Sequence, residues 1–202
     1  SAVCDALTTT LAGTSHTYQA LSEHTGSTRT WSYVSGPDAT PVFSDATLPN
    51  STVTVTLYGS YVFRWTEVNG NCSKSDEVTI DFNEAPDGLS AGSDASAICD
   101  ALSTTLAGTS HTYQALSEHT GSTRTWSYVS GPDATPVFSD ATLPNSTVTV
   151  TLYGSYVFRW TEVNGNCTKS DEVTIDFNED PDGLSAGSDA SAICDALSTT
   201  LA

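Results

Sequence analysis

The five cysteines have the most distinctive side-chain chemistry in this sequence of 202 residues. Cys4 and Cys99 lie in nearly identical segments, and Cys72 and Cys167 lie in the turns VNGNCSKSDEV and VNGNCTKSDEV. No second Cys or His stands at zinc-site spacing, so we expect disulfides in an oxidising compartment. The economical pairing joins Cys4 to Cys72 and Cys99 to Cys167, and the alternative joins Cys72 to Cys99. Cys194 is expected to pair outside this segment, either farther along the chain or on a neighbouring chain.

Acidic residues gather where one half of the sequence passes into the next. Carboxylates in flexible loops suit Ca²⁺, which accepts irregular sets of oxygen ligands. The candidate calcium ligands are Asp81, Glu84, Asp87, Asp94, Asp176, Glu179, Asp182 and Asp189. No tight Asp-x-Asp-x-Asp-Gly loop is present, so the alternative is a solvated acidic linker. The difference between Ala85 and Asp180 favours that alternative, because it indicates that the linker accepts an added charge.

The segment HTYQALSEHTGS at 16–27 and its copy at 111–122 hold the four histidines. They suggest either solvated loop histidines, a weak metal site, or a loop that binds glycans or a surface. The candidate residues are His16, Glu23, His24, His111, Glu118 and His119. No convergent catalytic set or Gly-x-Ser-x-Gly motif is evident, so we expect no enzyme. Asn50 and Asn145 stand in glycosylation sequons.

The sequence repeats itself with a period of 95 residues. The copies differ at Val3/Ile98, Thr8/Ser103, Ser73/Thr168 and Ala85/Asp180. Such a period matches a self-sufficient domain, not a solenoid unit. We expect one repeat at 1–87, a second at 88–182, and the start of a third at 183–202.

The charge excludes several functions. The chain has 24 acidic and 6 basic residues, for a net charge of −18. Such a surface repels nucleic acids and anionic lipids. No apolar run approaches the roughly 18 residues that a membrane helix needs. A highly soluble extracellular protein is the expected class.

Alternating apolar residues predict strands throughout each repeat. The clearest alternation is in STVTVTL at 51–57, SYVFRWTEV at 60–68 and DEVTIDF at 76–82. Turn signals separate these runs, and no segment shows a helical stripe. About seven strands per repeat predict an all-β chain of tandem immunoglobulin-like antiparallel sandwiches. Trp31 on the third strand and Tyr61, at the place of a tyrosine corner, agree with this prediction.

The motifs TW…SGP and YGSYVFRWT, together with the paired cysteines, resemble the immunoglobulin-like and PKD-like repeat domains of large secreted surface proteins of gliding and adhesive bacteria. The resemblance implies a structural role as a stalk or filament for adhesion or reach, and it implies no catalytic residues. The expected partners are further repeats of the chain and other copies, which would associate laterally or end to end. Two alternatives stay open: an array of glycan-binding or surface-binding modules, and a fibre in which 191–202 completes a neighbour's sandwich by β-augmentation.

Overall fold

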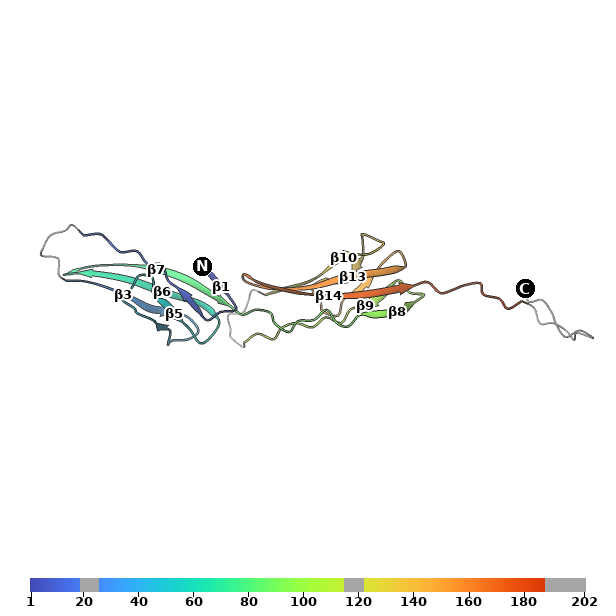
Figure 1. Ribbon diagram of the computed structural model, residues 1–202, viewed down its shortest axis with the longest axis horizontal. Coiled ribbons are helices and arrows are strands. Elements are labelled where there is room, and N and C mark those ends of the chain that lie inside the picture. Colours follow the sequence, from blue (N-terminus) through green and yellow to red (C-terminus); the bar gives the residue numbers. More distant parts are fainter. Residues whose placement is uncertain (19–25, 115–121, 188–202) are drawn as a thin grey trace, which may run out of the picture.

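The structure is a computed structural model that describes residues 1–18, 26–114 and 122–187. Two sandwiches lie end to end along one long axis, and an extended tail leaves the second sandwich (Figure 1). We call the sandwich of strands β1 to β7 repeat 1 and that of β8 to β14 repeat 2. The described ranges contain no helix long and apolar enough to cross a membrane.

In the residues that the structure describes, each repeat has seven strands in two sheets, as the alternation predicts. Repeat 1 contains β1 (Ala2–Cys4), β2 (Thr8–Thr10), β3 (Ser27–Ser35), β4 (Val42–Phe43), β5 (Thr52–Thr54), β6 (Gly59–Asn69) and β7 (Cys72–Asn83). Repeat 2 contains β8 (Ala95–Cys99), β9 (Ser103–Thr105), β10 (Thr123–Ser130), β11 (Val137–Phe138), β12 (Thr147–Thr149), β13 (Gly154–Asn164) and β14 (Cys167–Asn178). The chain is therefore all-β, and each repeat is an Ig/PKD-like sandwich.

The strand order shows one departure from a purely antiparallel sandwich. In repeat 1 the sheets have the orders β1-β7-β6-β3 and β2-β5-β4, and repeat 2 has the same arrangement. The first strand of each repeat pairs parallel to the last strand, β1 with β7 and β8 with β14. This pairing places Cys4 opposite Asn83, at the end of the sandwich where the chain leaves it.

The inward faces of the two sheets form the core of each repeat. Trp31, Val53, Phe63 and Ile80 are buried in repeat 1, as their alternation predicts. The tyrosine corner is also present, because the buried Tyr61 hydroxyl donates to the Leu57 carbonyl at 2.9 Å. Burial raises the pKa of Tyr61 to about 12. Large aromatic side chains, among them Trp31, Phe63 and Phe82, supply most of the volume of this core.

A buried aspartate joins two loops of each repeat. Asp38 accepts hydrogen bonds from the backbone and hydroxyl groups of Thr40 and Thr56, at 2.6 to 3.1 Å. Asp133 makes the same four contacts with Thr135 and Thr151 in repeat 2. These donors, with the side chains of Thr56 and Thr151 foremost, lower the pKa of each aspartate to about 2.

Candidate functional site at the junction of the repeats

A disulfide between Cys4 and Cys167 joins repeat 1 to repeat 2. Cys4 ends β1, and Cys167 begins β14 just after the β13–β14 turn. Their Cα atoms are 5.3 Å apart. Cys72 and Cys99 are free and exposed. The bond therefore connects the exit end of one sandwich to the entry end of the next.

The predicted pairing of Cys4 with Cys72 and Cys99 with Cys167 is wrong, and so is the alternative between Cys72 and Cys99. Cys4 lies beside the last residue of β7, whereas Cys72 is the first residue of that 12-residue strand. A strand of this length separates its ends by roughly 36 Å. A disulfide requires Cα atoms within about 7 Å. Cys194 lies outside the described residues.

The tip of the β13–β14 hairpin contacts the end of repeat 1. Asn83 donates from Nδ2 to Oδ1 of Asn166 at 2.9 Å. Asn166 in turn donates to the carbonyl oxygen of Ala2 at 3.3 Å. The buried Asn164 donates to the carbonyl oxygen of Glu84 at 2.8 Å. Side chains of repeat 2 thus satisfy polar groups of repeat 1 and of the segment that follows it.

That following segment, residues 84–94, runs along repeat 2 as a docked linker. The ring of His111 contacts the Asp87 carbonyl through Nδ1 at 2.6 Å and the Glu84 carboxylate through Nε2 at 3.3 Å. The ring therefore lies between two hydrogen-bond acceptors of the linker. The backbone N–H of Gln114 donates to the same carboxylate at 3.0 Å. Lys169 forms an ion pair with Asp87 at 3.3 Å.

The linker is also packed. Pro86 and Ala91 are fully buried, and Ala91 belongs to the core of repeat 2. Ser90 and Thr109 exchange two backbone hydrogen bonds, at 3.1 and 2.7 Å. Ala85 is only 3% exposed. The expectation that this place accepts a charge without cost is therefore wrong for Ala85, because a carboxylate here would be desolvated.

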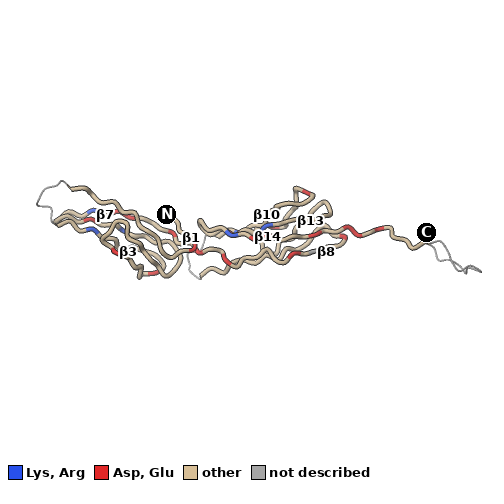
Figure 2. Tube along the Cα trace, viewed as in Figure 1, with Lys and Arg blue, Asp and Glu red and all other residues tan. Residues whose placement is uncertain are grey.

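The carboxylates that suggested calcium do not converge. In the described ranges no three His, Cys, Asp or Glu side chains come together in a way that could hold a metal ion. Glu84 and Asp87 contact His111 and Lys169, and Asp94 accepts the backbone N–H of Thr174 at 2.7 Å. Within the described ranges no shared cluster thus forms from Asp81, Glu84, Asp87, Asp94, Asp176, Glu179 and Asp182, and calcium binding by these residues stays a prediction. Asp189 lies outside the described residues. Figure 2 shows acidic positions spread along the linker and the tail.

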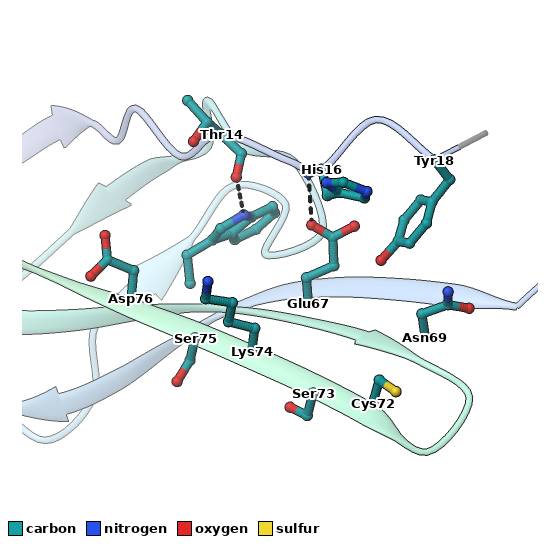
Figure 3. A pocket seen from close by; sticks show the side chains of 11 residues that line it. Thr14, His16, Tyr18, Glu67, Asn69, Cys72, Ser73, Lys74, Ser75 and Asp76 are labelled. Carbon is teal, nitrogen blue, oxygen red and sulfur yellow. Dashed lines mark hydrogen bonds between the residues drawn. The ribbon is translucent and has the colours of Figure 1, made fainter.

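The histidine loops begin at the same end of each sandwich. His16 lies in an open groove of about 590 Å³ on repeat 1, where its backbone N–H donates to Glu67 at 3.0 Å (Figure 3). His111, its counterpart in repeat 2, binds the linker. Glu23, His24, Glu118 and His119 lie outside the described residues. Asn50 and Asn145 are exposed in turns, and their glycosylation stays a prediction.

Sequence reasoning missed the junction as a site. Asn164, Asn166 and Lys169 belong to a turn that we interpreted only as the carrier of a cysteine. The sequence carries no direct signal for the junction, because only the β1–β7 pairing of the folded chain shows that Cys4 lies away from Cys72. Cys4 lies at the end of repeat 1 that faces repeat 2. Its partner within reach is therefore Cys167, the counterpart of Cys72 in the next repeat.

Comparisons with known proteins found similar chains among solved structures. No family model and no curated protein match it. Among solved structures, the PKD domain from the KIAA 1837 protein is 27% identical, with coverage of 49% of this chain and 92% of that one and a TM-score of 0.36. The PKD domain of human KIAA0319 is 19% identical, with coverage of 49% and 87% and a TM-score of 0.38. The titin fragment I67–I69 is 12% identical, with coverage of 89% and 62% and a TM-score of 0.48. These neighbours are PKD and Ig-like domains, each with a TM-score below 0.5.

Proposed function

We propose that the chain is a structural protein without enzymatic activity, built as an extended extracellular stalk or filament on a bacterial surface, for adhesion or reach. The observation that carries this proposal is the disulfide between successive repeats. Disulfides persist in oxidising compartments, which supports a place outside the cell. Ig/PKD-like domains often serve as structural or adhesion modules, which agrees with this role.

The junction gives the stalk its stiffness. Repeats joined by one linker rotate about it by default. Here the repeats have two covalent connections, the backbone at residues 83 and 84 and the bond from Cys4 to Cys167. The buried Pro86 and the contacts of His111 hold the linker between them. Bending at the junction must therefore break packing as well as rotate single bonds.

The same bond changes how the chain carries tension. When the two ends are pulled, the force passes from residues 1–4 through the disulfide into residues 167–202. Residues 5–166 lie inside the covalent loop and outside the path of the force. Neither core is required to resist the pull. We infer that the stalk bears load through covalent bonds, and that the sandwiches set its length and surface.

Single-molecule stretching between Ser1 and Ala202 tests this function. With the bond intact, the force–extension curve should show no unfolding step from residues 5–166 at any force too low to rupture covalent bonds. The variant Cys4→Ser/Cys167→Ser should unfold its repeats in steps and gain roughly 500 Å in total. Cys72→Ser/Cys99→Ser is the matched control, because it keeps the bond and should behave like the unmodified chain. Long releases in the oxidised chain would contradict the proposal.

A further inference from the structure

The open groove on repeat 1 corresponds to the surface that holds the linker on repeat 2. It is lined by residues from 14–18 and 65–76, whose counterparts at 109–113 and 160–171 differ only at Ser73/Thr168. Five of the counterparts contact residues 84–91: Thr109, His111, Asn164, Lys169 and Asp171. The groove therefore has the residues that bind this segment.

The groove is formed before anything binds to it. His16 N–H donates to Glu67 at 3.0 Å, and His111 N–H donates to Glu162 at 3.1 Å. The indole N–H of Trp65 donates to the Thr14 carbonyl at 3.0 Å, as its counterpart in repeat 2 does at 3.1 Å. The wall of the groove thus has the same hydrogen bonds with and without a linker over it, which lowers the entropic cost of docking.

A second copy of this segment is present at the other end of the chain. Residues 179–187 read EDPDGLSAG, and the docked linker at 84–92 reads EAPDGLSAG. The tail residues are exposed, and Leu184 is 84% exposed, whereas its counterpart Leu89 packs against the core of repeat 2. Figure 1 shows the tail at one end of the long axis and the β6–β7 turn, beside the groove, at the other.

We propose that the groove of repeat 1 binds residues 179–187 of a second copy of this chain, so that copies join head to tail. Cys99 of the copy that supplies the tail then lies beside Cys72 of the copy that supplies the groove, just as Cys4 lies beside Cys167 within one chain. Both thiols are exposed and free. The inference rests on the contact seen inside this chain and does not require the stalk function.

The covalent step needs an oxidant. One oxidised glutathione accepts two electrons from the thiols of Cys99 and Cys72 and leaves as two reduced glutathione molecules. The thiolate of one cysteine first attacks glutathione, and the second thiolate then displaces it from the mixed disulfide. One S–S bond breaks and one forms, and the two thiol protons pass to the two glutathione thiolates.

Asp180 makes the contact between copies weaker than the junction inside the chain. It stands where Ala85 is buried, so docking desolvates its carboxylate. The substitution Asp180→Ala should therefore strengthen head-to-tail association by roughly tenfold or more. His16→Ala should weaken the association by about tenfold. The His16 ring would contact Glu179 and Asp182 of the tail, as the His111 ring contacts Glu84 and Asp87, and alanine removes both contacts.

A disulfide map of mixed copies tests the pairing. Unlabelled and ¹⁵N-labelled chains, both with Cys194→Ser, are oxidised together in glutathione buffer and digested under non-reducing conditions. We expect Cys72 joined to Cys99 across the two isotopes, well above the share that random pairing gives. Random proportions of Cys72–Cys72, Cys99–Cys99 and Cys72–Cys99 bonds would overturn the proposal, as would Cys72–Cys99 bonds confined to single chains or the absence of all three.

Sedimentation measures the docking without the new bond. In a Cys72→Ser/Cys99→Ser/Cys194→Ser background, which keeps the Cys4–Cys167 bond, Asp180→Ala should raise the association constant and His16→Ala should lower it. Asn50→Ala, in an exposed turn away from the groove, is the control and should change nothing. Equal association in all variants would overturn the proposal, while the bond from Cys4 to Cys167 would still support the stalk.

Discussion

The hairpin ends of the two repeats have almost the same sequence and very different surroundings. Residues 65–76 and 160–171 differ only at Ser73/Thr168. The Glu67 side chain is 12% exposed and that of Glu162 is fully buried. Cys72 is exposed, and Cys167 is buried in a disulfide. The difference arises because the docked linker and the end of repeat 1 cover the hairpin end of repeat 2. The same residues are therefore exposed or buried according to whether another repeat packs against them.

The pair Glu162 and Glu67 should show the largest difference. Glu162→Ala leaves the guanidinium of Arg124 and the His111 N–H without their acceptor beneath the linker. We expect a loss of about 3 kcal/mol in the free energy of unfolding. Glu67→Ala removes the same contacts at a partly hydrated site and should cost about 1 kcal/mol. Urea unfolding followed by tryptophan fluorescence measures both variants, and equal losses would remove the distinction between the two ends.

The glycines of the two hairpin turns give a second matched pair. Gly165 and Gly70 have φ near +60°, so alanine strains both turns by about 1 kcal/mol. A Cβ atom at Gly165 would clash with the Asn83 amide, and one at Gly70 would have nothing within 4 Å. Gly165→Ala should therefore cost about 1 kcal/mol more, since Asn83 must give up its hydrogen bond. The melting temperature of Gly165→Ala should therefore be lower than that of Gly70→Ala. Identical melting temperatures would mean that the Cβ atom is accommodated at the junction without loss of stability.

Acid should affect both repeats alike. The pKa of Asp38 and of Asp133 is about 2 in the folded chain, below the ordinary value of 3.8. A lowered pKa adds stability above pH 4, and this stability is lost as the pH falls from 4 to 2. Asp38→Asn/Asp133→Asn should be less stable at pH 7 and should lose less stability over that interval. Melting curves from pH 7 to 2 test this, and parallel losses in both proteins would contradict it.

The smallest effect is expected at the exposed ion pair of the junction. Lys169 and Asp87 have side chains 55% and 60% exposed. Lys169→Ala should change stability by about 0.5 kcal/mol at most, and the change should vanish in salt. Lys74→Ala is the matched control in repeat 1. A loss well above that of the control would show that this pair, and not the buried contacts, holds the linker.

The fold was predictable because its signals are local. Alternation in the segments of β5, β6 and β7 fixes which side chains face the core, and Tyr61 marks the corner by its place in Gly-x-Tyr-x-Phe. These patterns depend on the pleat of a single strand. The same patterns occur in both repeats, so the sequence predicts the same fold for each.

The junction was not predictable from the same patterns. Cys4 and Cys72 lie in one repeat, and only their placement at opposite ends of β7 excludes a bond between them. Ala85 looked like an exposed linker residue, since nothing local indicates that repeat 2 covers it. Contacts between repeats depend on how two folded sandwiches pack against each other. Because the two repeats have nearly the same sequence, the sequence does not indicate that the hairpin end of repeat 2 is covered and that of repeat 1 is not.

A tryptic digest under non-reducing conditions tests the central claim most directly. The five cysteines fall on five different tryptic peptides, and Ser73 against Thr168 separates the two hairpin peptides by mass. The structure predicts that residues 1–29, with Cys4, are joined to residues 160–169, with Cys167. A bond from residues 1–29 to residues 65–74, with Cys72, would place the disulfide within one repeat and contradict the account.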